Sequence, residues 1–94
     1  MVVMILESVS PSLRGELTRW LLEPKAGVFV GTVSALVRDK LWELVGRRVG
    51  GGGGILVHTT DNEQGFALQC RGDTTRIVRD FEGLSLVTVP PKQS

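Results

Sequence analysis

The fold is decided by residues 2–21, which read VVMILESVSPSLRGELTRWL. Val2–Leu6 is a continuous apolar run of strand length, which indicates a strand buried on both faces in the middle of a sheet. Ser10 and Pro11 predict the start of a helix, because serine is a good N-cap and proline is favoured at the first helical position. The apolar residues that recur at helical spacing predict one buried stripe, made of Leu13, Leu17, Trp20 and Leu21. We expect Pro24 to end this helix.

The next segment repeats the pattern of a strand followed by a helix. Val28–Val30 is a short apolar run between two glycines, and Ser34 is placed to cap a helix that runs to about Arg48. The apolar face of this helix consists of Val37, Leu41, Leu44 and Val45, with Trp42 at its edge. We expect the charged residues to lie mostly on the solvent side, namely Arg38, Asp39, Lys40 and Glu43.

Five consecutive glycines, residues 50–54, separate this helix from the rest of the chain. Glycine loses more backbone entropy on ordering than any other residue, so the run predicts a flexible connector. The run lacks the Gly-Lys-Ser/Thr ending of a phosphate-binding P-loop, and we do not interpret it as one.

Three further strands are predicted after the glycines. Ile55–Thr60 has the composition of a strand, and the polar residues 61–65 predict a hairpin turn. The returning strand alternates apolar and other residues as far as Cys70, which we interpret as a small core residue. After a polar loop, Leu84–Val89 predicts the last strand of the chain.

These elements predict a single α+β domain that spans residues 1–94. Their order is β-α-β-α-β-β followed by the C-terminal strand, with two helices on one face of a mainly antiparallel sheet. The other face of the sheet would carry apolar residues without a helix to cover them. Two such faces can pack against each other, which is the physical argument for a homodimer.

The composition is that of a globular protein, with 41% hydrophobic and 22% charged residues. The formal net charge of +1 is low for a free-standing DNA-binding domain, which usually has a strongly basic face. No apolar run approaches the ~20 residues that span a bilayer. Cys70 is the only cysteine, so an intrachain disulfide is impossible. We therefore expect a cytoplasmic protein.

Glu7 is the first candidate for chemistry, because it directly follows the first predicted strand. A carboxylate at a strand end can bind Mg²⁺, which prefers hard oxygen ligands. A two-metal nuclease site needs several carboxylates, and a two-fold axis could bring Glu7 of a second copy nearby. The alternative is a solvated carboxylate close to the N-terminus of a helix. His58, the only histidine, is interpreted as a surface or hydrogen-bonded residue and not as a catalytic base.

The basic residues of interest fall in three places, which are Arg14 and Arg19, then Arg38 and Lys40, and finally Arg76 and Arg79. Arg14 and Arg38 are expected within the first turn or so of their helices, where free N–H groups and the positive end of the dipole attract phosphates. A dimer would duplicate each position and could form a basic stripe along a DNA duplex. The alternative is a set of ordinary solvated arginines, some of them paired with carboxylates.

Several motifs of the chain resemble one known family. They are residues 10–15 (SPSLRG), 20–23 (WLLE), 26–31 (AGVFVG), 33–35 (VSA) and 80–84 (DFEGL). In these motifs the chain resembles the CRISPR-associated protein two of subtype I-E, and the similarity extends over nearly the whole length. The resemblance implies a ferredoxin-like fold and a homodimer. It also implies that the C-terminal strand and tail, residues 84–94, reach the partner protomer.

The resemblance further implies a function in CRISPR adaptation. In this family a dimer sits between two dimers of the CRISPR integrase subunit, and the assembly captures double-stranded prespacer DNA. The integrase subunit performs the transesterification, while the smaller protein spaces the assembly and clamps the DNA. The alternative activity that the family implies is a magnesium-dependent endonuclease that cleaves DNA or RNA through Glu7. A third alternative is a dimer that binds only protein.

The residues that the family uses can be located in this sequence. Its basic DNA-contact positions fall on Ser12, Arg14, Leu36, Arg38, Thr75 and Arg76, of which three are basic here. We therefore expect Arg14, Arg38 and Arg76 to contact phosphates. Arg79 is a further candidate for the same role. The segment that docks the integrase subunit corresponds to Leu84, Leu86, Val87 and Val89.

Overall fold

The computed structural model describes residues 1–48 and 52–72. Its elements are β1 (Val2–Leu6), α1 (Pro11–Leu17), β2 (Leu22–Lys25), β3 (Val28–Gly31), α2 (Ala35–Arg48), β4 (Gly54–Thr59) and β5 (Phe66–Arg71). All paired strands are antiparallel, and their order in the sheet is β2-β3-β1-β4-β5. The first six elements have the βαββαβ order of a ferredoxin-like fold, to which β5 adds a hairpin strand. The expected α+β class is confirmed.

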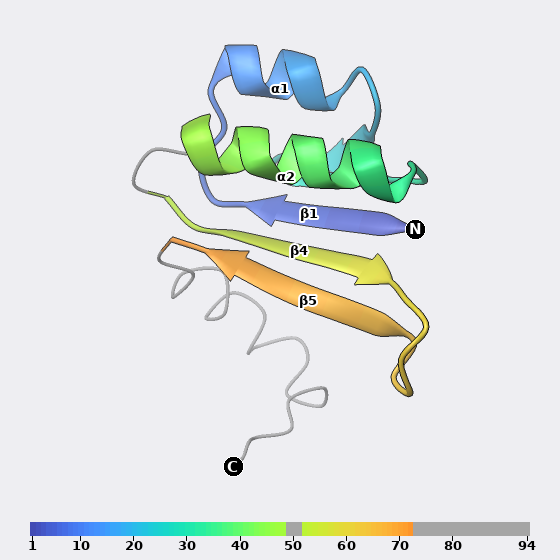
Figure 1. Cartoon of the computed structure of the whole chain (residues 1–94). Helices are drawn as coiled ribbons and strands as arrows, with labels where there is room; N and C mark the ends of the chain where they lie inside the picture. The colour runs from blue at the N-terminus through green and yellow to red at the C-terminus, as the bar shows by residue number, and fades with distance from the viewer. Residues whose placement is uncertain (49–51, 73–94) are drawn as a thin grey trace.

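The core lies between the sheet and the two helices, which cover the same face of it (Figure 1). Strand β1 is central, and its alternate residues Val2, Met4 and Leu6 are buried beneath the helices. Phe29 of β3 and Leu56 of β4 flank Met4 in the same row of the sheet and are fully buried. A side-chain period of two residues therefore places one face of three adjacent strands in the core.

Helix α1 begins as the sequence predicts and ends earlier. The Ser10 Oγ accepts a hydrogen bond from the N–H of Leu13 at 3.2 Å, which is the predicted N-cap. The helix ends at Leu17, and the expected continuation to Pro24 is wrong. Leu21 is buried as expected, but Trp20 lies in the turn after the helix with half of its surface exposed. Trp20 is therefore not part of the buried stripe.

The segment predicted to finish the first helix is instead the edge strand β2. Leu22 pairs with Val30 and Lys25 pairs with Val28, with an irregular register between them. Proline is tolerated at a sheet edge because the missing N–H need not face another strand. Pro24 thus stands in a strand, and the hairpin of β2 and β3 completes the ferredoxin-like order.

Helix α2 agrees with its prediction except at Trp42. The Ser34 Oγ caps it by accepting from the N–H of Val37 at 3.2 Å. Trp42 is predicted at the edge of the apolar face, but it is only 4% exposed and belongs to the core. Among the described residues, neither helix is long and apolar enough to cross a lipid bilayer.

The last three glycines of the run 50–54 are closely packed, so the expected flexible connector is wrong for them. The N–H of Glu7 donates to the carbonyl of Gly53 at 2.9 Å. A Cβ on Gly54 would lie 2.8 Å from Cδ2 of Leu6, and a Cβ on Gly72 would lie 2.6 Å from the carbonyl oxygen of Gly52. These approaches require glycine because a side chain would overlap its neighbours. Residues 50 and 51 lie outside the described part.

The face of the sheet opposite the helices is apolar, as expected. Its side chains form two rows across paired strands, which are Val30–Val3–Val57–Leu68 and Val28–Ile5–Ile55–Cys70. Cys70 lies on this face and is exposed, so its expected place in the core is wrong. The reason is the register, because Gln69 and not Cys70 stands beside the buried Leu56. The expected strand 84–89 lies outside the described residues.

Candidate nucleic-acid interface

Arg14 is held in place by a carboxylate. It lies in the last turn of the short helix α1, and its Nε donates to both oxygens of Glu23, at 2.9 and 3.1 Å. The Oε2 of Glu23 also accepts from the N–H of Gly27 at 3.0 Å. The Arg14 side chain remains 42% exposed, and these bonds use only its Nε. Its two Nη groups are the donors left for a ligand.

The ionisation of Glu23 keeps this arrangement intact. The hydrogen bond from the backbone of Gly27 lowers the pKa of Glu23 below its ordinary value, and the hydrogen bond and charge of Arg14 lower it further, against the opposing effect of burial. A carboxyl with a lowered pKa stays charged at neutral pH. Arg14 therefore keeps its partner under physiological conditions.

Arg38 lies in the first turn of α2, and its expected solvent-side placement is wrong. Its side chain is only 19% exposed. The Nε and Nη2 groups both lie 3.0 Å from Oδ1 of Asp39, and Nη1 lies 3.1 Å from Nδ1 of His58. Nε and Nη2 thus share an acceptor on Asp39, and Nη1 has an acceptor in the His58 tautomer whose Nδ1 carries no proton. A ligand phosphate has to share these donors or displace a partner.

His58 is the buried polar side chain of the described residues. It lies on the helix-facing side of β4, where it is paired with Val2 of β1 and Ala67 of β5. Its Nδ1 lies 3.1 Å from both Nη1 of Arg38 and the carbonyl oxygen of Thr59. The interpretation of His58 as a hydrogen-bonded residue agrees with these contacts. The partners explain why a polar ring is tolerated under the helix.

Glu7 lies immediately after β1, beside the glycine run. Its Oε1 accepts a hydrogen bond from the N–H of Gly53 at 3.2 Å. Within residues 1–48 and 52–72 there is no group of three His, Cys, Asp or Glu side chains that could hold a metal ion. A magnesium site at Glu7 would therefore have to use this one carboxylate with water ligands, or groups outside the described part of one protomer.

The last turn of α2 carries basic side chains that the sequence motifs do not single out. Arg47 and Arg48 end this helix, and Nη1 of Arg48 lies 3.3 Å from Oγ of Ser12 in α1. Arg71 reaches the same turn from the end of β5, and its guanidinium carbon lies 5.1 Å from the ring centroid of Trp42. The adjacent pair Arg47–Arg48 is a visible signal in the sequence, whereas the place of Arg71 depends on the strand register.

The two predicted DNA contacts in the described part lie on different helices, Arg14 on α1 and Arg38 on α2. The contact between Arg48 and Ser12 joins the end of α2 to the start of α1. Arg38 lies ten residues before Arg48 on the same helix, which is about 15 Å at 1.5 Å per residue. The other predicted site residues, Arg76, Arg79, Leu84, Leu86, Val87 and Val89, lie outside the described part of the chain.

Comparison with known protein families agrees with the resemblance found in the sequence. The model of a family described as CRISPR-associated protein (Cas_Cas2CT1978) matches residues 1–86. The match covers every described element of the sheet and both helices.

Proposed function

Since the chain belongs to this Cas2-type family of CRISPR-associated proteins, we propose that it is a homodimeric scaffold that holds prespacer duplex DNA together with the CRISPR integrase subunit. The observation that carries the proposal is the anchoring of Arg14 by Glu23, which leaves the Nη groups of Arg14 for a ligand. An arginine that is already held in one geometry loses less conformational freedom when it binds. Arg38, anchored by Asp39, is the second contact in this proposal, and a phosphate there shares the Arg38 donors with Asp39 and His58 or displaces one of them.

A scaffold of this kind reads the DNA backbone and not the bases. Arginine side chains contact phosphate oxygens without sequence information, and each contact releases counterions. The formal net charge of +1 is small, so one protomer attracts DNA only weakly and depends on its individual arginine contacts. A dimer doubles them, and the integrase subunit supplies the remaining affinity in this proposal.

Substitution of the anchored arginines tests the proposal. We expect R14Q and R38Q to weaken the binding of a short duplex by the complex with the integrase subunit. They should also make the binding constant less dependent on salt, measured as the slope of its logarithm against the logarithm of the salt concentration. Each phosphate that the variant no longer neutralises lowers that slope by about 0.9. R19Q is the matched control, because Arg19 is 69% exposed and only loosely paired with Glu16 at 3.6 Å. Equal binding by R14Q, R38Q and R19Q would contradict the scaffold.

The alternative of a magnesium-dependent nuclease has a separate test at Glu7. The best variant is E7Q, because the amide oxygen can still accept the hydrogen bond from Gly53. In the scaffold proposal, E7Q forms the complex and integrates prespacers at the wild-type rate. Cleavage of DNA or RNA that requires Mg²⁺ and is lost in E7Q would favour the nuclease instead. Subtype I-E remains part of the proposal and is tested by assembly with an integrase subunit of that subtype.

A further inference from the structure

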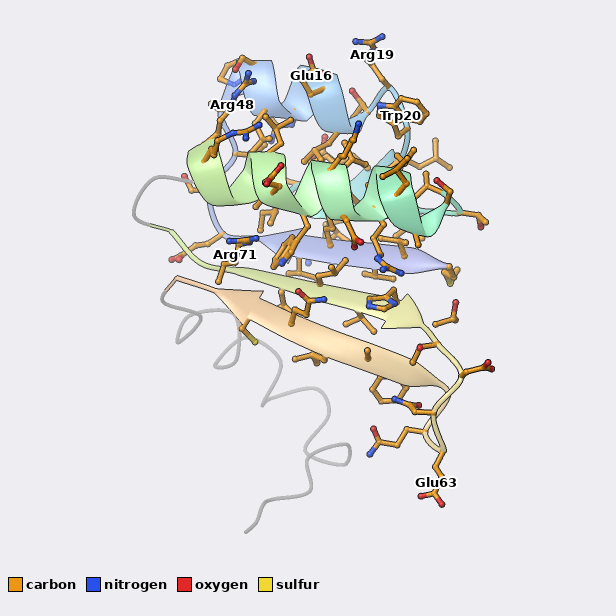
Figure 2. The ribbon with its side chains drawn as sticks, viewed as in Figure 1. Glu16, Arg19, Trp20, Arg48, Glu63 and Arg71 are labelled. Atoms are coloured by element: carbon orange, nitrogen blue, oxygen red, sulfur yellow. The ribbon has the colours of Figure 1, made fainter. Side chains whose placement is uncertain are left out.

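Arginines from two elements meet around the last turn of α2. Arg48 extends from the helix towards α1, where Nη1 lies 3.3 Å from Oγ of Ser12. Arg71 comes from the end of β5 and lies beneath the same turn. Figure 2 shows Arg48 and Arg71 at the same end of the molecule, on opposite sides of α2. The two guanidinium groups are thus placed along one edge of the helix layer.

Two neighbours fix the guanidinium of Arg71. It lies over the ring of Trp42, which is itself only 4% exposed and therefore rigid. Gly46 leaves the space on the other side, because a Cβ there would lie 2.6 Å from Nη1 of Arg71. Gly46 is exposed, so this Nη1 lies beside the molecular surface. The site is therefore built, with the arginine held before any ligand arrives.

The hydrogen-bonding capacity of Arg71 is not used within the described chain. Its Nε is buried and has no hydrogen-bond partner there. A buried N–H without an acceptor is unfavourable, so the position is not explained by stability alone. An anionic ligand bound at Nη1 of Arg71 would bring an acceptor close to this unpartnered Nε.

The charges of this edge are poorly compensated. Among the described residues, neither Arg48 nor Arg71 forms an ion pair, in contrast to Arg14 and Arg38. Arg47 lies 3.8 Å from Glu43, and both side chains are mostly exposed, which makes this pair weak. Cations at a helix C-terminus stabilise the helix dipole, which accounts for Arg47 and Arg48. It applies to Arg71 as well, whose Nη1 lies beside Gly46 in this turn, but it leaves the buried Nε of Arg71 without an acceptor.

We propose that Arg48 and Arg71 form a second phosphate-binding site for the backbone of duplex DNA, separate from Arg14 and Arg38. This inference rests on the proposed function, since it adds phosphate contacts to the same duplex. The double variant R48Q/R71Q should bind a short duplex roughly three- to tenfold more weakly at about 0.1 M salt, with the loss uniform across DNA sequences. Its salt slope should fall by about 0.9 for each phosphate that is no longer bound.

The variant G46A keeps the charge of Arg71 but moves its guanidinium group. The methyl group of G46A would displace the guanidinium of Arg71 from Trp42, because Nη1 now occupies that space. G46A should weaken duplex binding without lowering the melting temperature, since alanine favours the helix over glycine. Should R71Q fail to fold, R48Q alone and G46A still test the site, because Arg48 and Gly46 are both exposed. R19Q serves again as the control.

The experiment is fluorescence anisotropy of a labelled duplex in a salt series, with the full chain alone and with the integrase subunit. Weaker binding by R48Q/R71Q and by G46A, with R19Q at the wild-type level, supports the proposal. Wild-type binding by both variants overturns it while leaving the scaffold intact, provided that R14Q still binds weakly. If the wild-type protein binds no duplex either alone or together with the integrase subunit, both proposals are overturned.

Discussion

At the scale of single residues, Glu23 of β2 joins three neighbouring elements of the fold. Its carboxylate accepts from Arg14 of α1 and from the backbone of Gly27 in the turn between β2 and β3. The carbonyl of Gly27 in turn accepts from the N–H of Leu6 at the end of β1, at 2.8 Å. One acidic side chain thereby connects the first helix, the edge hairpin and the central strand.

The substitution E23Q tests this connection and has a defined pH dependence. The lowered pKa of Glu23 means that the folded protein holds this proton less tightly than the unfolded chain, whose carboxyl titrates near 4.5. The stabilisation is therefore present above pH 4.5 and is lost as the pH falls through the lower folded pKa. We expect E23Q to melt a few degrees below the wild type at pH 7. The difference should shrink in acid.

Thermal unfolding followed by circular dichroism between pH 7 and pH 3 measures this effect. The matched control is E16Q, because Glu16 is more exposed and lies 3.6 Å from Arg19 in a loose pair. E16Q should melt close to the wild type at every pH. A constant difference between E23Q and the wild type down to pH 3 would show that the charge of Glu23 does not contribute.

Arg48 illustrates what residue patterns alone cannot reveal. The family resemblance gives a basic position at residue 12, where this chain has serine. In the fold, a guanidinium nitrogen of Arg48 lies 3.3 Å from the hydroxyl of that serine, although the two residues are 36 positions apart. Arg48 therefore brings a positive charge to the place where the family has a basic side chain at position 12.

At the scale of elements, the sequence predicts those with strong local signals. Strand β1 is a continuous apolar run, and both helices have a serine N-cap that the structure confirms. Strand β2 is missed because LEPK contains one apolar residue, a proline and no alternation. Its pairing with β3 is a tertiary interaction that leaves no periodic pattern. The same holds for the half-buried Arg38, which contacts His58 from β4, 20 positions away in the sequence.

The glycine run is the element whose local signal is most misleading. Gly54 begins β4 and is buried between Leu6 and Trp42. We expect G54A to destabilise the protein by about 1–3 kcal/mol, because overpacking a well-packed core forces its neighbours to shift. The added Cβ would lie 2.8 Å from Cδ2 of Leu6 and 3.4 Å from Cη2 of Trp42.

The control for this prediction is G15A in the interior of α1. A Cβ on Gly15 would meet no atom within 4 Å, so the helix propensity of alanine should stabilise the protein by up to about 1 kcal/mol. Urea denaturation of both variants gives the two free energies. Equal stability of G54A and the wild type would restore the interpretation of this glycine as part of a flexible connector.

At the scale of the whole molecule, the two faces of the sheet have different roles. The helix-covered face holds the core, and the helix layer carries Arg14, Arg38 and Arg48. The opposite face has apolar rows from four strands, and Leu68 in one of them is 55% exposed. Association through this face would place both helix layers, with their arginines, on the outside of a dimer.

The proposed homodimer predicts that a charge on the apolar face separates the protomers. Sheets that pack face to face lie about 10 Å apart, so an aspartate at position 68 would be buried without a partner. We expect the wild type to be a dimer in light scattering and L68D to dissociate at least roughly tenfold more readily, where a factor of ten corresponds to about 1.4 kcal/mol. L36D is the matched control, because Leu36 is 66% exposed and lies on α2, away from this face. A monomeric wild type would contradict the homodimer, and an L68D variant that dimerises as well as L36D would exclude this face as the interface. In either case, association through the apolar face could not bring the arginines of two protomers to one DNA duplex.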